Sequence, residues 1–245
     1  MKLFIRFLFS GLMLSMVLSL VAHAQIRDRF RNNTITMFDP TIISTWIQQP
    51  IAVSDAERAM NAKGSMYLFD DWREGTLILK NDTMVEGLKL RYNIYARQMH
   101  FIYLQDTLAL IVPDKVKYVV LENLAFVWTD YLEDNLLKKD YFQILVEGQN
   151  RLLFHRKVKF DPKSPPATPY STGTVDDRFL RFENTYLQKG NEPAVQLKRS
   201  RRGLMASFPD KSQEIKQFMR KERIRPKKTQ DLIKVVQFYN KLVSG

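Results

Sequence analysis

The feature that most constrains the fold is a period of two in the hydrophobic residues between Tyr67 and Phe160. In its clearest stretch, Leu88, Leu90, Tyr92 and Ile94 alternate with Lys89, Arg91, Asn93 and Tyr95. Residues 99–103 and 115–120 alternate in the same way. Because successive side chains of a β-strand point to opposite faces, this pattern predicts half-buried strands.

Turn-forming residues separate these stretches at roughly ten-residue intervals. Examples are Asn81-Asp82, Gln105-Asp106 and Gly148-Gln149-Asn150. We therefore predict an antiparallel β-meander, closed as a barrel or folded as a sandwich. Strands do not alternate with helices along this region, which argues against a Rossmann or TIM-barrel architecture.

Residues 161–175 interrupt the strands, because four of them are proline. Proline has no backbone N–H and stiffens the chain, so an extended loop is expected here. A last hairpin is predicted after it, formed by residues 179–187 and 194–197.

The hydrophobic period changes after Leu197 to that of helices. Ser200 is predicted to cap a short helix that ends near Ser207, and Ser207 to cap the next. Ile215, Phe218 and Met219 share one face of that second helix. Thr229 is predicted to begin a third helix, with an apolar stripe of Leu232, Val235, Val236, Tyr239 and Leu242. The fold class is therefore α+β, with a meander followed by a small helical module.

The first 24 residues have the pattern of a secretory signal peptide. Lys2 and Arg6 precede an apolar run over residues 7–21, and Ala22-His23-Ala24 is a small-residue cleavage site. We expect cleavage near Ala24 and a periplasmic or secreted protein with no later membrane span; an uncleaved anchor is the alternative. Residues 25–63 form an N-terminal arm, in which the capping box Ser54–Glu57 predicts a short helix. The expected segments are thus 1–24, 25–63, 64–197 and 198–245.

Charge is distributed unevenly along the chain, which has 38 Lys and Arg against 26 Asp and Glu. Residues 198–245 contain 14 basic and four acidic residues, a net of +10, whereas residues 25–197 contain 22 of each. A neutral body with a basic tail suggests an anionic partner. For an exported protein, this means an anionic envelope component or an acidic protein rather than nucleic acid. The alternative is that the basic residues only solvate the outer faces of helices.

The candidate binding residues are the basic positions that cluster in the sequence of this tail. Near an anionic surface each Lys or Arg contributes about 1 kcal/mol, so several on one face suffice for reversible docking. They are Lys198, Arg199, Arg201, Arg202, Lys227 and Lys228.

Catalytic motifs are missing from the sequence, and no cofactor or metal site is predicted. The chain has no cysteine, and the only histidines after residue 24 are His100 and His155. Asp70, Asp71 and Glu74 lie around Trp72. These are the residue types of a glycosidase site, and they are the basis of a hydrolase alternative. Asp130, Glu133 and Asp134 lack the spacing of a calcium loop.

Aromatic residues on neighbouring predicted strands suggest a further alternative. Tyr92, Phe101, Tyr103 and Tyr118 are the types that line a ligand-binding barrel, and equally those of an ordinary β core. If they enclose a cavity, the protein is a carrier of a small apolar or lipid ligand.

Several short stretches resemble a family of uncharacterised exported proteins of Gram-negative bacteria. They are Gly64-Ser65-Met66-Tyr67-Leu68, Trp72-Arg73-Glu74-Gly75, Leu90-Arg91-Tyr92-Asn93-Ile94-Tyr95, Phe208-Pro209-Asp210-Lys211, Glu214-Ile215-Lys216-Gln217-Phe218, Asp231-Leu232-Ile233-Lys234 and Tyr239-Asn240. Gly203 departs from it, because a helix former is expected there. The resemblance implies the meander-plus-helices architecture and no activity.

Together these features predict a non-enzymatic exported binding or adaptor protein. Its basic C-terminal helices are expected to contact an anionic envelope component or an acidic partner protein, and the carrier and hydrolase hypotheses remain as alternatives.

Overall fold

The structure is a computed structural model, and it describes residues 34–35, 62–103, 105–111, 113–163 and 176–244. The predicted signal peptide, the predicted helix after Ser54 and most of the proline-rich loop lie outside the described residues. Contacts between residues divide the chain into two units. Unit 1 contains residues 123–155 and 184–245, and unit 2 contains residues 30–122 and 156–183, with residues 1–29 assigned to unit 1.

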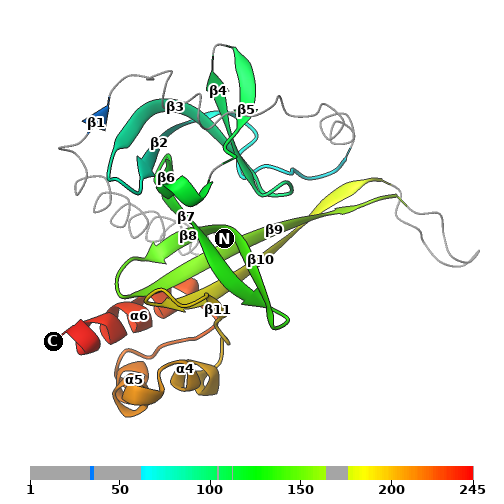
Figure 1. Cartoon of the computed structure of the whole chain (residues 1–245). Helices are drawn as coiled ribbons and strands as arrows, with labels where there is room; N and C mark the ends of the chain where they lie inside the picture. Colours follow the sequence, from blue (N-terminus) through cyan, green and yellow to red (C-terminus); the bar gives the residue numbers. More distant parts are fainter. Residues whose placement is uncertain (1–33, 36–61, 104, 112, 164–175, 245) are drawn as a thin grey trace, which may run out of the picture. The chain divides into compact units, whose positions relative to one another are not determined.

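The α+β prediction is confirmed, because an antiparallel β-meander is followed by C-terminal helices (Figure 1). The meander formed by the described strands is not closed, so the predicted barrel is wrong. The strands are β1 (Thr34–Ile35), β2 (Arg73–Leu79), β3 (Met84–Asn93), β4 (Gln98–Tyr103), β5 (Asp106–Ala109), β6 (Val116–Leu121), β7 (Leu124–Glu133), β8 (Leu136–Val146), β9 (Asn150–Asp161), β10 (Arg178–Lys189) and β11 (Val195–Gln196). The helices are η2 (Pro113–Lys115), α4 (Arg201–Ser207), η3 (Pro209–Lys211), α5 (Ser212–Lys221) and α6 (Thr229–Ser244).

Unit 2 is built on the strands whose alternation is clearest in the sequence. β2, β3, β4 and β5 pair antiparallel in chain order, and β6 returns to pair with the other edge of β2. Leu88, Leu90 and Tyr92 of β3 are buried while Lys89 is exposed, as the period of two predicts. Gly75 permits a close approach between strands, since a Cβ there would lie 2.3 Å from a methyl of Leu90.

One strand of unit 2 departs from the antiparallel pattern. β1, which lies in the predicted N-terminal arm, pairs in parallel with β3 through Thr34 with Met84 and Ile35 with Val85. Two residues are too few to produce a visible period, so this strand could not be predicted from the sequence.

Unit 1 contains β7, β8, β11 and the adjoining halves of β9 and β10. The β7–β8 hairpin closes through Asp134 and Asn135, which have φ values of 53° and 61°. Two successive residues with positive φ form the tight turn whose twist matches a two-residue hairpin. The predicted hairpin after the proline-rich loop is also present, with Leu187 opposite Val195 and Tyr186 opposite Gln196.

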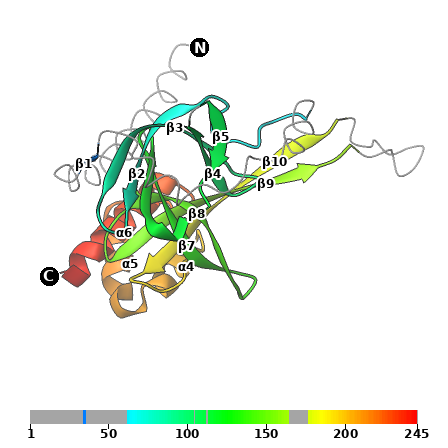
Figure 2. The same cartoon turned by 45° about the horizontal axis from the view of Figure 1, so that its top comes forward.

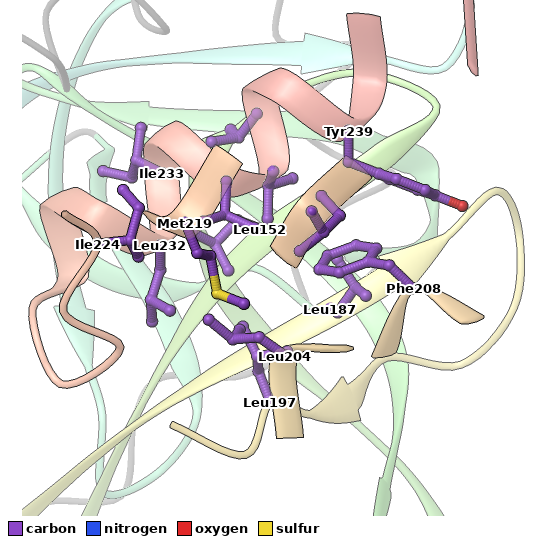
Figure 3. Close-up of a cluster of buried hydrophobic side chains, with 14 residues drawn as sticks. Leu152, Leu187, Leu197, Leu204, Phe208, Met219, Ile224, Leu232, Ile233 and Tyr239 are labelled. Atoms are coloured by element: carbon purple, nitrogen blue, oxygen red, sulfur yellow. The ribbon is translucent and has the colours of Figure 1, made fainter. Parts of the chain in front are cut away.

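The helices α4, α5 and α6 share a hydrophobic core with these strands, and Figure 3 shows the side chains that form it. Strand residues such as Leu152 and Leu187 pack with helix residues such as Leu204 and Leu232 in a single cluster. The predicted faces are confirmed, because Ile215, Met219 and most of the α6 stripe are buried. The helices are therefore an integral part of unit 1.

The helix ends confirm one predicted cap and correct another. Ser200 caps α4, since its hydroxyl accepts a hydrogen bond from the Gly203 N–H. Ser207 does not cap the following helix: it ends α4, and its hydroxyl donates to the Gly203 carbonyl at 3.0 Å. A serine can satisfy either helix end, so the local sequence alone does not separate the two roles.

Packing explains why a glycine occupies position 203, where the family resemblance leads us to expect a helix former. A Cβ at this position would lie 2.5 Å from the Lys198 Cβ and 2.6 Å from the Lys198 carbonyl oxygen. Real Cβ contacts are essentially never this short. Gly203 therefore lets the chain before α4 fold back against the helix, which a better helix former would prevent.

A pair of asparagines ties α6 to the turn between β8 and β9. The Asn240 side-chain oxygen accepts from the Asn150 backbone N–H at 3.1 Å and from its side-chain amide at 3.0 Å. The Asn240 amide donates to the Asn150 carbonyl at 2.8 Å. These bonds fix where α6 lies along the strands.

Candidate functional site: a basic surface on the helical module

Arg199 brings the two basic segments of the tail together. Its guanidinium donates to the Pro226 carbonyl at 3.4 Å, to the Lys227 carbonyl and to the Thr229 hydroxyl at 3.2 Å. Residues 27 to 30 positions apart in the sequence thus meet at the connection between α5 and α6. The two basic runs, separate in sequence, are neighbours in the fold.

The predicted basic residues are mostly exposed around this junction. Five of them are exposed and Arg199 is half-buried. None of the six has a carboxylate partner within the part of the chain that the structure describes. We call this set the basic surface: Lys198, Arg199, Arg201, Arg202, Lys227 and Lys228.

Three of the four acidic residues of the helical module, Asp210, Glu214 and Asp231, have partners outside the basic surface, and the fourth, Glu222, is exposed at the end of α5. Asp210 accepts the Tyr239 hydroxyl at 3.1 Å, and burial, followed by this hydrogen bond, raises the pKa of Tyr239. Asp231 accepts the Arg225 N–H at 2.8 Å, and Glu214 lies 3.8 Å from Lys211. These carboxylates therefore stabilise the helix ends and do not neutralise the basic surface.

The predicted ligand-lining aromatics lie in unit 2 and do not form one lining. Tyr92 and Phe101 are 1% and 3% exposed, and Tyr103 is half-buried. Tyr118 is buried and pairs with Ile78 of β2. Gly75, three residues before Ile78, pairs with Leu88, which lies on the same face of β3 as Tyr92. Because side chains alternate along β2, Tyr118 projects from the other face of these strands. The register thus divides the four residues between two faces.

A pocket does occur in unit 1, at a position that the sequence did not indicate. It has a volume of about 330 Å³, and it lies on the face of the β10–β11 hairpin beside the end of α4. Leu187 and Val195 form apolar parts of its wall, and Lys189, Glu192 and Ser207 contribute polar groups. None of the four predicted aromatics lines it.

The two histidines are buried at separate places. His155 is stacked on Phe142 at 4.5 Å and lies 3.0 Å from Asp140, in an aromatic cluster with Tyr131 and Tyr186. Burial, with neighbouring carboxylates, raises the pKa of Tyr186 to about 12, so this hydroxyl stays neutral.

His100, in β4 of unit 2, is 1% exposed. Burial, with a further contribution from the charge of Arg91 opposite it, lowers the pKa of His100 to about 4. Both histidines therefore serve as packed residues of their units.

The carboxylates around Trp72 have different partners from one another. Asp70 accepts the Ser65 hydroxyl at 2.5 Å, Glu74 lies 3.4 Å from Lys89 and Asp71 lies 3.9 Å from Arg73. Trp72 itself stacks under the guanidinium of Arg91, at 4.4 Å from the ring centre. The arrangement is that of a surface loop with cation–π packing.

The described residues contain neither a metal-binding cluster nor a membrane-spanning helix. No group of three or more histidine, cysteine or acidic residues in the described ranges is arranged to hold a metal ion. Within those ranges, no helix has the length and apolar character to cross a bilayer.

The β7–β8 hairpin carries a group of exposed apolar side chains that was not predicted from the sequence. Leu132, Leu136 and Leu137 are 37%, 60% and 62% exposed. Sequence periodicity does not reveal this exposure, because Leu136 and Leu137 followed by Lys138 and Lys139 are equally typical of the first residues of a buried strand. The signal that was available is the Asp134-Asn135 pair, which marks a tight turn and places the leucines at its tip.

Comparison with known proteins gave no match among protein-family models, curated proteins or solved structures. The resemblance to exported proteins of Gram-negative bacteria therefore stays a prediction from the sequence.

Proposed function

We propose that this chain is a non-enzymatic exported binding or adaptor protein, active in the periplasm, whose basic surface contacts an anionic partner. The observation that supports the proposal most directly is the junction at Arg199, where two basic segments meet without carboxylate partners in the described part of the chain. Because all six cations occur within one helical module, an anion that approaches this surface meets several of them at once.

The charges retained by this surface suffice for reversible binding. Lys198, Arg202 and Lys228 are exposed, and a cation close to an anionic surface contributes about 1 kcal/mol. Arg199 uses its donors on backbone carbonyls, so it acts as a positioning residue that holds the two segments together. Screening limits these contributions to about 8 Å at physiological salt, and binding should weaken as salt rises.

The test compares two variants of identical net charge on a heparin column, with heparin as the anionic probe. The double reversal Arg202→Glu and Lys228→Glu alters the basic surface. The double reversal Lys234→Glu and Lys241→Glu alters exposed residues of α6. We expect the first variant to lose at least about 30-fold in affinity, equivalent to about 2 kcal/mol, and to elute at lower salt than the second.

Equal elution of the two variants would overturn the proposal, since net charge alone would then explain the retention. Deletion of residues 198–245 is not a suitable test, because it removes Leu204, Phe208, Leu232 and other core residues of unit 1. Far-UV circular dichroism of both variants confirms that they are folded before the columns are compared.

A further inference from the structure

We infer that the tip of the β7–β8 hairpin is a membrane-contacting element, and that the anionic partner of the basic surface is a lipid bilayer. This inference rests on the proposed function, which it deepens by naming the partner. Three observations support it: the hairpin has exposed leucines, the backbone of its tip is paired, and the basic surface begins near the tip.

Leu132, Leu136 and Leu137 are exposed and lie on the two sides of the Asp134-Asn135 turn. Figures 1 and 2 show that the β7–β8 hairpin ends in a turn that projects from the strands. Leu132 and Leu137 are directly opposite one another in the register and share one face of the hairpin. Leu136 occupies the last rung, opposite Glu133, and projects from the other face, so the tip carries apolar side chains on both faces. Exposed apolar side chains that gather at one place mark an interaction site more often than single exposed residues do. A convex tip fits a fluid acyl layer, which adapts to its shape without a preformed groove.

The backbone and the charges of the tip suit a nonpolar environment at shallow depth. The rungs from Leu132 to Leu137 and from Glu133 to Leu136 pair the backbone across the hairpin, and an apolar layer accepts only paired backbone groups. Glu133 forms an ion pair with Lys138 at 2.7 Å, which removes one negative charge. Asp134 is exposed in the turn, so the tip reaches the headgroup region and not the bilayer centre.

The basic surface begins close to this tip, because Lys198 follows a residue that is hydrogen-bonded to β7. Ala194 donates to the Asp130 carbonyl at 2.8 Å, and its own carbonyl accepts from Leu132 at 2.9 Å. β11 follows directly, and the bridge between Tyr131 and Ala194 is parallel, so the chain leaves Ala194 in the direction in which β7 runs to its tip. Lys198 comes four residues later, a reach of about 13 Å in an extended chain.

Apolar contact and anionic attraction are thus provided by neighbouring parts of unit 1. A peripheral membrane protein needs both, because either alone gives only weak, reversible binding. An acidic protein partner would explain the cations but gives no role to three leucines on a convex tip, which is why the observations favour the bilayer.

The experiment measures sedimentation of the chain from Gln25 onward, without the predicted signal peptide, with vesicles of phosphatidylcholine alone and with vesicles that also contain phosphatidylglycerol. The test variant is Leu136→Ser with Leu137→Ser. The matched control is Tyr95→Ser with Phe182→Ser, which removes apolar side chains that are 40% and 44% exposed in unit 2. We expect binding to the anionic vesicles only, a loss of tenfold or more for the leucine variant, and no change for the control.

Three outcomes would overturn the inference: no binding of the unaltered chain to anionic vesicles, equal loss in the leucine variant and the control, or no loss in either. The heparin result separates these failures from failure of the proposed function. In one such case, Arg202→Glu with Lys228→Glu weakens heparin binding but the unaltered chain does not sediment with vesicles. The anionic partner is then a protein or another soluble polyanion, and only the membrane inference fails. A leucine variant that keeps full heparin retention shows that its loss on vesicles is due to the apolar tip.

Discussion

The buried histidine of β4 predicts a specific dependence of stability on pH. His100 is 1% exposed, and burial and Arg91 lower its pKa from 6.5 to about 4. Its Nδ1 has no hydrogen-bond partner among the described residues. In the unfolded chain the same imidazole takes up a proton near pH 6.5. The folded state therefore keeps His100 neutral through a range in which the unfolded state is charged.

The sign and size of the effect follow from this difference. A group whose folded pKa is lowered contributes stability that is present above its unfolded pKa and is lost as the pH falls toward its folded pKa. For His100 this window runs from 6.5 down to about 4. At 1.36 kcal/mol per pKa unit, the chain loses about 2 kcal/mol by pH 5 and about 3 kcal/mol by pH 4.

The measurement is the free energy of unfolding by urea between pH 7.5 and pH 4, for the unaltered chain and for His100→Gln. We expect the difference between the two proteins to shift by about 3 kcal/mol over this range, to the disadvantage of the unaltered chain at low pH. Phe101→Leu, which changes the adjacent packing without removing a titratable group, should give a curve parallel to that of the unaltered chain. Parallel curves for His100→Gln as well would refute the reasoning.

Three further substitutions test contacts within unit 1. Gly203→Ala places a Cβ 2.5 Å from the Lys198 Cβ, so the free energy of unfolding should fall by about 1 kcal/mol or more, measured as a lower melting temperature. An unchanged or higher melting temperature contradicts the packing argument. Arg199→Gln removes charge-assisted hydrogen bonds to residues 226–229, and should cost about 1–3 kcal/mol with faster amide exchange in that connection; unaltered exchange there argues against the positioning role. Asn240→Ala leaves donors of Asn150 without their acceptor, and urea unfolding should show a loss of about 1–3 kcal/mol; a loss below about 0.5 kcal/mol would mean that water replaces the amide.

Local patterns in the sequence predicted the elements well. The alternation around Leu90 and the apolar faces of α5 and α6 depend only on the geometry of one strand or helix, so a single sequence contains the necessary information. The cap at Ser200 and the hairpin of residues 179–197 were predicted for the same reason. β1 was missed because a two-residue strand has no period, and its parallel pairing with Met84 and Val85 is a tertiary contact.

The candidate site depended more on tertiary contacts, which explains the mixed success there. The basic residues were identified from composition, but their convergence depends on the side chain of Arg199 reaching the α5–α6 connection. The division of Tyr92 and Tyr118 between two faces depends on strand register, which is set by pairing partners far away in the sequence. The exposed Leu136 and Leu137 resemble core residues in sequence, because hydrophobicity alone does not reveal where a strand leaves the core.

The interleaving of the two units has a consequence for folding during synthesis. Unit 2 is interrupted by residues 123–155, and unit 1 contains α6 near the end of the chain. A chain that emerges N-terminus first therefore delivers β7 and β8 before unit 2 has its last strand segments. Leu152 of β9 and Leu187 of β10 then stay uncovered until α4, α5 and α6 follow. Neither core can close on the growing chain until late, so the incomplete chain exposes strand edges and apolar faces that favour aggregation.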